Sequence, residues 1–143
     1  MSDEATNGSP TIPPGAGVLP MITVVGGAAA VDFYTRAFEA VEEYRAVGPD
    51  SGKIMHSRLA INGGYLLLSD DFPEFRGGSA PPPPAAVTLH LQVDDADVWW
   101  DRAVREGAEV QMPIGDQFWG DRYGQIRDPF GHVWSIGGPS PKT

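Results

Sequence analysis

The same order of strands and helices is predicted twice along this chain, and no other feature of the sequence restricts the fold as strongly. Each half contains a segment with strand periodicity, a segment with apolar side chains three and four residues apart, and three further strand segments. In the first half these are residues 19–25, 28–38, 41–47, 53–61 and 65–69, and in the second half residues 86–93, 95–107, 109–114, 122–127 and 132–136. The repeat predicts an α+β fold of two β-α-β-β-β modules that form a curved mixed sheet around a cleft.

A tight turn joins the last two predicted strands. Asp128, Pro129 and Gly131 occupy the first, second and fourth positions of this turn, where each of these residue types is favoured. Residues 122–127 and 132–136 on either side of it alternate as paired strands do. We therefore predict that the second module ends in a β-hairpin.

Composition divides the chain into modules and connecting segments. Residues 1–17 are rich in Ser, Thr, Pro, Gly and acidic residues without any period, which is typical of a disordered tail. Four consecutive prolines at residues 81–84 cannot join a helix or the interior of a sheet, and they favour an extended spacer. The predicted organisation is a tail at residues 1–17, a module at 18–70, a linker at 71–85, a module at 86–138 and a tail at 139–143.

Charge and cysteine content exclude several classes of function. The formal net charge is -9, so the chain lacks the basic surface that nucleic-acid binding requires. The sequence contains no cysteine, which excludes a disulfide framework, a thiolate nucleophile and a zinc–thiolate site. No apolar run approaches the roughly 20 residues of a membrane span, and the acidic N-terminus is unlike a secretory signal. We expect a cytoplasmic protein that does not bind nucleic acid or membranes.

A helix can cover only one face of each module's sheet, so the two bare faces can enclose a pocket for a small molecule. Strand alternation decides which side chains face that pocket. In the strand at residues 53–61 we expect Met55 to pack inward and His56 to face the pocket. Trp119 lies in a glycine-containing loop, where its ring either covers the core or forms an aromatic wall for a planar or cationic ligand. The predicted ligand-binding residues are His56, Arg58, Leu67, Thr88, His90, Gln92, Trp119, Arg122 and Ser135.

Several segments resemble one known family. They are VDFYTRAF, KIMHSRL, LLLSDDFPE, LHLQVDDAD and, most specifically, DQFWGDRYGQIRDPFGHVWSI. In these segments the chain resembles the vicinal oxygen chelate superfamily of glyoxalases, bleomycin-resistance proteins and extradiol dioxygenases. It resembles the PhnB-like branch of this superfamily most closely. The resemblance covers residues 19–137. It implies the glyoxalase/bleomycin-resistance fold and, by analogy with its members, a homodimer.

The resemblance also bears on metal binding. Enzymes of this superfamily usually bind a divalent metal through one side chain from the first and one from the fourth strand of each module. The matching positions are residue 19 or 20, Leu67, Thr88 and Ser135, and none is His, Glu or Asp. A leucine cannot ligate a metal, and hydroxyls are poor ligands for Zn, Ni or Fe. We therefore expect no cofactor, although His56 and His90 leave open a divalent metal at another position.

Three hypotheses of function remain. The first is a protein that binds a small organic molecule without the usual metal, by sequestration as antibiotic-binding relatives do, or by metal-free chemistry. The second is a metal-dependent lyase or isomerase of the glyoxalase type that uses His56 and His90. The third is a domain with a purely structural or interaction role. His56 or His90 can alternatively serve as a general base, or simply be a hydrogen-bonded residue of the cavity, so no catalytic residue is assigned.

Overall fold

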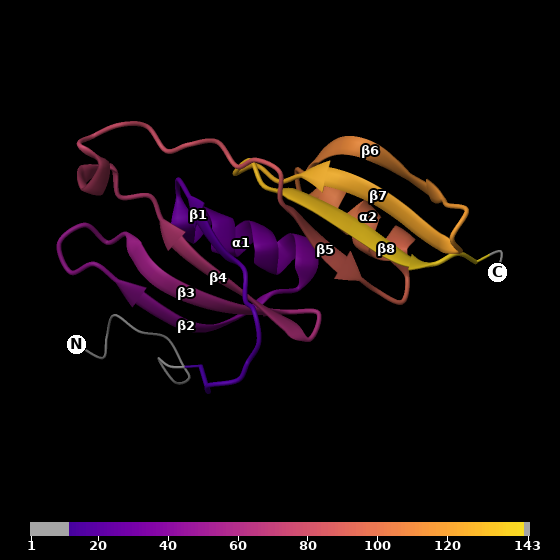
Figure 1. The fold of residues 1–143 in the computed structure, drawn as a ribbon, viewed down its shortest axis with the longest axis horizontal. Coiled ribbons are helices and arrows are strands. Elements are labelled where there is room, and N and C mark those ends of the chain that lie inside the picture. The colour runs from indigo at the N-terminus through magenta and orange to yellow at the C-terminus, as the bar shows by residue number, and fades with distance from the viewer. Residues whose placement is uncertain (1–11, 142–143) are drawn as a thin grey trace. The chain divides into compact units, whose positions relative to one another are not determined.

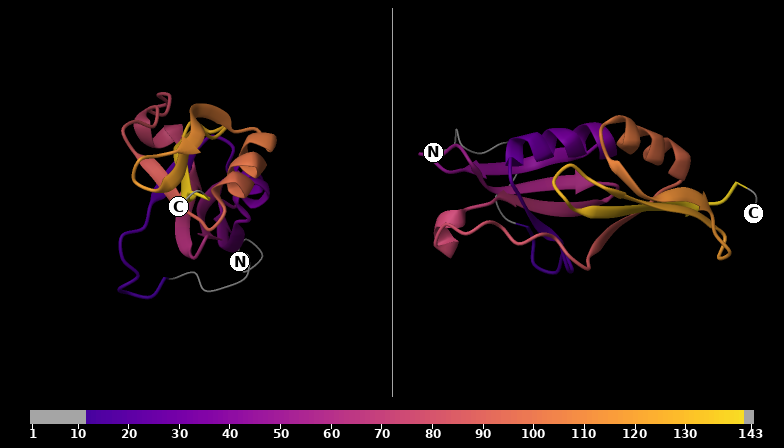
Figure 2. Two further views of the ribbon diagram at one scale, coloured as in Figure 1. Left: turned by 90° about the vertical axis from the view of Figure 1, so that its right-hand side faces the viewer. Right: turned by 90° about the horizontal axis from the view of Figure 1, so that it is seen from above.

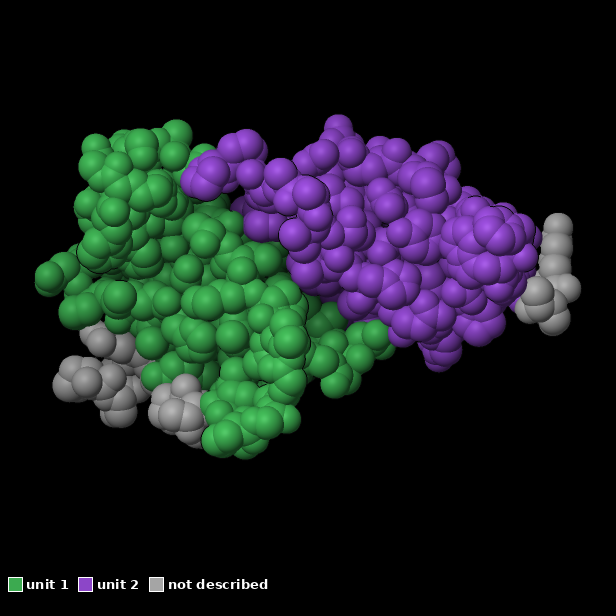
Figure 3. Space-filling view, in the orientation of Figure 1, with its two compact units in different colours: residues 1–35, 39–81 green, residues 36–38, 82–143 purple. Residues whose placement is uncertain are grey.

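A computed structural model of the chain describes residues 12–141 and divides into two compact units (Figure 3). The first unit comprises Met1–Thr35 and Glu39–Pro81, and the second comprises Arg36–Phe38 and Pro82–Thr143. The predicted N-terminal tail falls outside the described residues as far as residue 11, and so do the last two residues of the predicted C-terminal tail. Within residues 12–141, no helix is long and apolar enough to cross a membrane.

Among its described residues, the first unit contains one α-helix and a four-stranded mixed sheet (Figure 1). Its strands lie in the order β1-β4-β3-β2, with β1 parallel to β4 and the other pairs antiparallel. Along the chain its elements are β1 (Met21–Val24), α1 (Gly27–Phe38), β2 (Val41–Val47), β3 (Ile54–Ile61) and β4 (Gly64–Asp70).

The second unit repeats this topology. Its strands lie in the order β5-β8-β7-β6, again with the first and last strands of the module paired in parallel. Its elements are β5 (Thr88–Gln92), α2 (Ala96–Arg105), β6 (Glu109–Asp116), β7 (Asp121–Arg127) and β8 (Val133–Pro139). The predicted α+β fold of two β-α-β-β-β modules is therefore confirmed.

Each helix lies along one face of its own sheet and leaves the other face open (Figure 2). In the second unit, Trp100 of α2 packs so closely on β7 that a Cβ at Gly124 would lie 2.6 Å from its ring. Trp134 and Ile136 of β8 are buried on this same side, as the alternation predicts. Burial of each such side chain stabilises the fold by roughly 1.5–3 kcal/mol.

The start of α1 is held by a carboxylate that is distant in sequence. Gly26 has a left-handed φ of 94° and provides no side-chain cap. Asp70, at the end of β4, accepts hydrogen bonds from the backbone nitrogens of Gly26 (3.1 Å) and Gly27 (2.7 Å). It also accepts one from Ile54 N at 2.8 Å. Asp70 therefore satisfies free helix N–H groups and places a negative charge at the positive end of the helix dipole.

One predicted side-chain orientation in β3 is wrong. Met55 was expected to pack inward, but its side chain is 51% exposed, whereas Ile54 is 1% exposed. The cause is a β-bulge, because His56 pairs with Ala46 and Ile54 pairs with Val47, so that Met55 is an extra residue between them. The bulge reverses the alternation at the beginning of β3 and gives the core position to Ile54.

The predicted turn between β7 and β8 is present, and a buried carboxylate organises it. Asp128 is 3% exposed, and its Oδ1 accepts hydrogen bonds from Phe130 N (2.9 Å) and His132 N (3.0 Å). Its Oδ2 accepts a third from Trp134 Nε1 at 2.9 Å. Gly131 has a φ of 94°, a conformation that glycine adopts without strain. Asp128 thus fixes both the turn and the buried indole.

The segment between the modules is structured at its beginning. It contains a short 3₁₀ helix, η2 (Pro73–Arg76). Arg76 makes two hydrogen bonds to the Asp71 carboxylate, at 2.6 and 3.0 Å, and this interaction lowers the pKa of Asp71 below its ordinary value. The four prolines that follow are exposed.

Candidate functional site

The second unit has a polar and aromatic face on the side of its sheet that α2 leaves uncovered. We call this surface the open face of the β5–β8 sheet. Strand register places its members side by side, because His90 and Gln125 both pair with Ser135, and Tyr123 pairs with the neighbouring Gly137. Its side chains include Thr88, His90, Gln92, Asp121, Tyr123, Gln125 and Ser135, and Arg127 and Val133 continue this face at the far end of their strands.

Both ring nitrogens of His90 are hydrogen-bonded on this face. Nδ1 lies 2.7 Å from Ser135 Oγ, and Nε2 lies 2.8 Å from Gln92 Oε1. The amide oxygen of Gln92 can only accept, so the hydrogen-bond pattern assigns the proton to Nε2 and makes Nδ1 the acceptor of the Ser135 hydroxyl proton. The amide nitrogen of Gln92 is directed at Asp121 Oδ2, 3.5 Å away. These contacts fix the orientation of the imidazole.

Gly137 has no side chain, and this leaves room for the His90 imidazole. A Cβ built at Gly137 would lie 3.1 Å from His90 Cε1 and 3.3 Å from Gln92 Oε1. Because glycine occupies this position on β8, the His90 ring from β5 meets the Tyr123 ring from β7 across it. The two ring centroids are 5.9 Å apart with an angle of 23° between the planes.

Two further aromatic contacts extend this pair toward the β6–β7 loop. The Trp119 ring meets Tyr123 edge-on at 5.8 Å, and Phe118 meets Trp119 edge-on at 5.1 Å. Trp119 is 52% exposed and Phe118 is 97% exposed. The Tyr123 hydroxyl accepts a hydrogen bond from Gln125 Nε2 at 3.0 Å. We call His90, Tyr123, Trp119 and Phe118 the aromatic row; it presents large apolar rings to solvent, a feature that marks binding surfaces.

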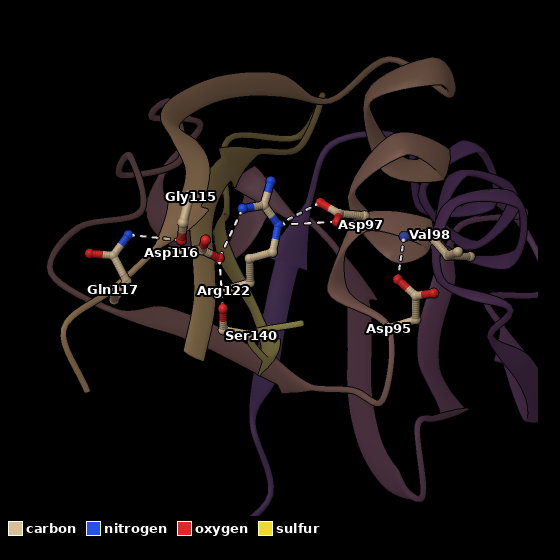
Figure 4. A network of polar contacts seen from close by, with 8 residues as sticks. All are labelled: Asp95, Asp97, Val98, Gly115, Asp116, Gln117, Arg122 and Ser140. Atoms are coloured by element: carbon tan, nitrogen blue, oxygen red, sulfur yellow. Dashed lines mark hydrogen bonds and ion pairs between the residues drawn. The ribbon is translucent and has the colours of Figure 1, made fainter. Parts of the chain in front are cut away.

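Arg122, which the sequence placed with these residues, lies on the opposite face. Its Nε donates to both carboxylate oxygens of Asp97 on α2, at 2.9 and 3.1 Å, and its NH1 donates to Asp116 Oδ1 at 3.1 Å (Figure 4). Asp116 also accepts a hydrogen bond from Ser140. The bonds to Asp97 and Asp116 raise the pKa of the Arg122 guanidinium above its ordinary value. Arg122 therefore joins the start of α2 to the β6–β7 hairpin and is not brought together with His90.

Three of the predicted ligand-binding residues belong to the first unit, on the face of its sheet that α1 leaves uncovered. The His56 ring lies 6.3 Å from the Tyr44 ring. Arg58 is buried, forms a 3.1 Å ion pair with Glu43, and lies over the Tyr65 ring at 5.9 Å. Leu67, the third residue, is partly exposed.

The sequence prediction omitted Asp121, Tyr123 and Gln125 from the site. A signal for them exists in the alternation along β7, since Ile126 is apolar and buried. Counting back from it by twos places Gly124 and Arg122 on the helix side, and leaves the odd-numbered residues on the open face. The composition of the β6–β7 loop had instead favoured Arg122 as a ligand-binding residue.

A family model matches residues 19–136 of the chain. The chain belongs to the Glyoxalase/Bleomycin resistance protein/Dioxygenase superfamily. The match spans nearly all of the residues that form the two modules, and the topology of both units agrees with it.

Comparisons with individual proteins and solved structures show similar chains. "Uncharacterized protein Mb0911c" of Mycobacterium bovis is 48% identical over 124 residues, which cover 84% of this chain and 81% of the relative. The crystal structure of protein PA1353 from Pseudomonas aeruginosa is 25% identical, has a TM-score of 0.69, and is matched over 85% of this chain and 96% of its own. A PhnB protein from Bacillus cereus, at 17% identity, shares the fold with a TM-score of 0.66 over 85% of this chain and 98% of its own.

The residues at the superfamily's metal-binding positions do not fit a divalent transition metal. Leu67 offers only carbon atoms, Thr88 offers a hydroxyl, and the Ser135 hydroxyl is engaged with His90. Both nitrogens of His90 also have partners within the chain. Over residues 12–141, no three His, Cys, Asp or Glu side chains are grouped so that they could hold a metal ion.

Proposed function

We propose that the protein binds a small organic molecule on the open face of the β5–β8 sheet and acts by sequestering it, without the superfamily's usual metal. The observation that carries this proposal is the aromatic row, in which exposed rings continue into an imidazole held by two hydrogen bonds. Rigid rings beside a few oriented polar groups are the usual composition of a small-molecule site. The description of the superfamily, which includes bleomycin-resistance proteins, agrees with such a role.

The hydrogen bonds of the two His90 ring nitrogens favour a role in ligand binding over a role in acid–base chemistry. A general base needs a free lone pair within reach of the substrate proton. Here Nδ1 accepts from Ser135, and Nε2 donates to Gln92, so the ring offers its face rather than a nitrogen. We therefore assign stacking, and not proton transfer, to His90.

A screen of aromatic small molecules by thermal shift, followed by calorimetry, tests the proposal. Trp119→Ala is expected to weaken binding of a hit about tenfold, since a lost aromatic contact is worth about 1.5 kcal/mol. Phe75→Ala is the matched control, because Phe75 is an exposed ring on η2 in the other unit. The ligand is expected to be recovered unchanged by mass spectrometry. Conversion of the ligand, or equal binding by Trp119→Ala, would show that the proposal is wrong.

We further propose that the protein is a homodimer, as the family resemblance implies. Strands β2 and β6 are edge strands of their sheets. Each carries an exposed valine, Val41 on β2 and Val110 on β6. Light scattering after gel filtration is expected to give twice the chain mass of 15.3 kDa. A monomer mass at micromolar concentration would contradict this.

A further inference from the structure

The open face of the β5–β8 sheet carries a carboxylate without a cationic partner in the described part of the chain. Between residues 12 and 141, the side chain that contacts the Asp121 carboxylate through a hydrogen bond is Gln92, whose amide nitrogen lies 3.5 Å from Oδ2. That distance is at the limit of a hydrogen bond and involves a neutral donor. Among residues 12–141, no arginine or lysine of this face therefore balances the negative charge of Asp121.

The carboxylates of Asp97 and Asp116, on the side of the same sheet that α2 covers, differ from Asp121 because they have a cationic partner. Asp97 and Asp116 each form an ion pair with the guanidinium of Arg122. Arg127, at the far end of β7, donates to the Gly131 carbonyl and to Gln111. Six residues of strand, roughly 20 Å, separate it from Asp121. Counting the described residues alone, the end of the open face near the aromatic row thus carries a negative charge.

The aromatic row lies next to this charge. Tyr123 is two residues from Asp121 on the same face of β7, and Trp119 contacts Tyr123. The faces of aromatic rings are electron-rich and attract cations, most strongly when a carboxylate is close. Gln92 connects the Asp121 carboxylate with the aromatic row. Its amide nitrogen is directed at Asp121, and its amide oxygen accepts a hydrogen bond from His90.

We propose that the ligand of this face is a planar organic cation, whose ring stacks on the aromatic row and whose positive charge lies beside Asp121. This inference rests on the proposed binding function and specifies the ligand class of the same site. Stacking rings supply most of the contact area, and the carboxylate supplies discrimination by charge. A phosphonate or carboxylate ligand would meet repulsion at this end of the face.

Three fused-ring probes of similar size and different charge test the inference by equilibrium dialysis: proflavine (cation), phenazine (neutral) and anthracene-9-carboxylate (anion). We expect proflavine to bind at least about fivefold more tightly than phenazine, and the anion to bind most weakly. Asp121→Asn keeps the size of the side chain and an oxygen acceptor. It is expected to bring the affinity for proflavine to the level of phenazine while phenazine binding is unchanged. Asp101→Asn removes the same charge from an exposed position on α2 and is expected to have no effect.

The outcomes separate this inference from the proposed function. If proflavine and phenazine bind equally, and Asp121→Asn changes neither, the ligand class is wrong while the binding function stands. Tightest binding of the anion, or binding of none of the three probes, also overturns the ligand class. Loss of phenazine and proflavine binding together in Trp119→Ala supports the aromatic row as the shared contact. The compound screen with Trp119→Ala tests the binding function by itself.

Discussion

Asp128 is a single residue on which the end of the second module depends. Its carboxylate satisfies two backbone N–H groups of the turn and the Trp134 indole. Asp128→Ala leaves three donors without their acceptor in a buried place, so we expect a loss of about 3 kcal/mol or more in the free energy of unfolding. Urea unfolding of the variant measures this loss.

The matched control is Asp101→Ala, which removes the same charge from an exposed helix position. Its effect is expected to stay within about 0.5 kcal/mol. Asp128→Asn should be intermediate, because one amide oxygen remains while the amide nitrogen faces another donor. Equal stability of Asp128→Ala and Asp101→Ala would contradict the role of Asp128.

Gly137 is predicted to be required for the geometry of the aromatic row. In Gly137→Ala the new methyl lies 3.1 Å from His90 Cε1, and the ring has little freedom because both nitrogens are bonded and one face meets Tyr123. We expect weaker hydrogen bonds to His90, seen as altered imidazole ¹⁵N shifts, and weaker ligand binding. Gly115→Ala is the control, since its nearest neighbouring atom is 4.0 Å away. Unchanged ¹⁵N shifts in Gly137→Ala would refute the prediction.

The sequence was informative about residues whose role is local. Asp128 could be placed in the turn because neighbouring residues determine a turn. Arg122 could not be placed correctly from composition, because its partners Asp97 and Asp116 lie on other elements. The contacts of His90 depend on the register of β5 with β8, which the sequence alone does not specify.

At the scale of elements, the start of α1 depends on a close approach between Gly27 and Asp70. A Cβ at Gly27 would lie 2.7 Å from Asp70 Oδ2. We expect Gly27→Ala and Asp70→Ala each to destabilise the protein by about 1–3 kcal/mol, the first by overcrowding and the second by leaving N–H groups unsatisfied. In the double variant the methyl group no longer meets a carboxylate. Its combined loss, measured by urea unfolding, should be smaller than the sum, and an additive result would contradict the proposed contact.

The η2 segment is predicted to lose stabilisation in acid. Arg76 lowers the pKa of Asp71 in the folded chain, so this interaction stabilises the fold above the unfolded pKa of about 4 and is lost as pH falls through the lower folded value. The stability difference between the wild type and Asp71→Asn should therefore be largest near neutral pH and shrink below about pH 4. Denaturant unfolding at several pH values measures it. Asp50→Asn, in an exposed turn, should show no such trend, and a constant difference for Asp71→Asn would disprove the mechanism.

Element order was predictable because it depends on periodicity along the chain. The predicted bounds of β2 and the predicted end of α1 agree with the structure. The bulge at Met55 was not predictable, because it arises where β2 and β3 pair with unequal numbers of residues. Alternation along a single strand therefore predicts the face on which each side chain lies only where the pairing with the neighbouring strand is regular.

At the scale of the whole molecule, one helix contributes residues to both compact units. Most of α1 belongs to the first unit, whereas its last turn, Arg36–Phe38, belongs to the second. Within the second unit, the buried Phe38 ring lies 4.6 Å from the Trp134 ring, and Arg102 Nε donates to the Ala37 carbonyl at 2.8 Å. A helix cannot lose its last turn without weakening the preceding one.

We therefore predict that the two units unfold together. The four tryptophans, Trp99, Trp100, Trp119 and Trp134, all belong to the second unit, so their fluorescence reports on that unit alone, while far-UV circular dichroism reports on both. The two signals should give coincident urea transitions. Phe38→Ala is expected to lower the free energy of unfolding by about 3–5 kcal/mol, whereas the exposed Phe75→Ala should not. Separate transitions in the wild type would mean that the shared helix does not couple the units, and that each module is stable by itself.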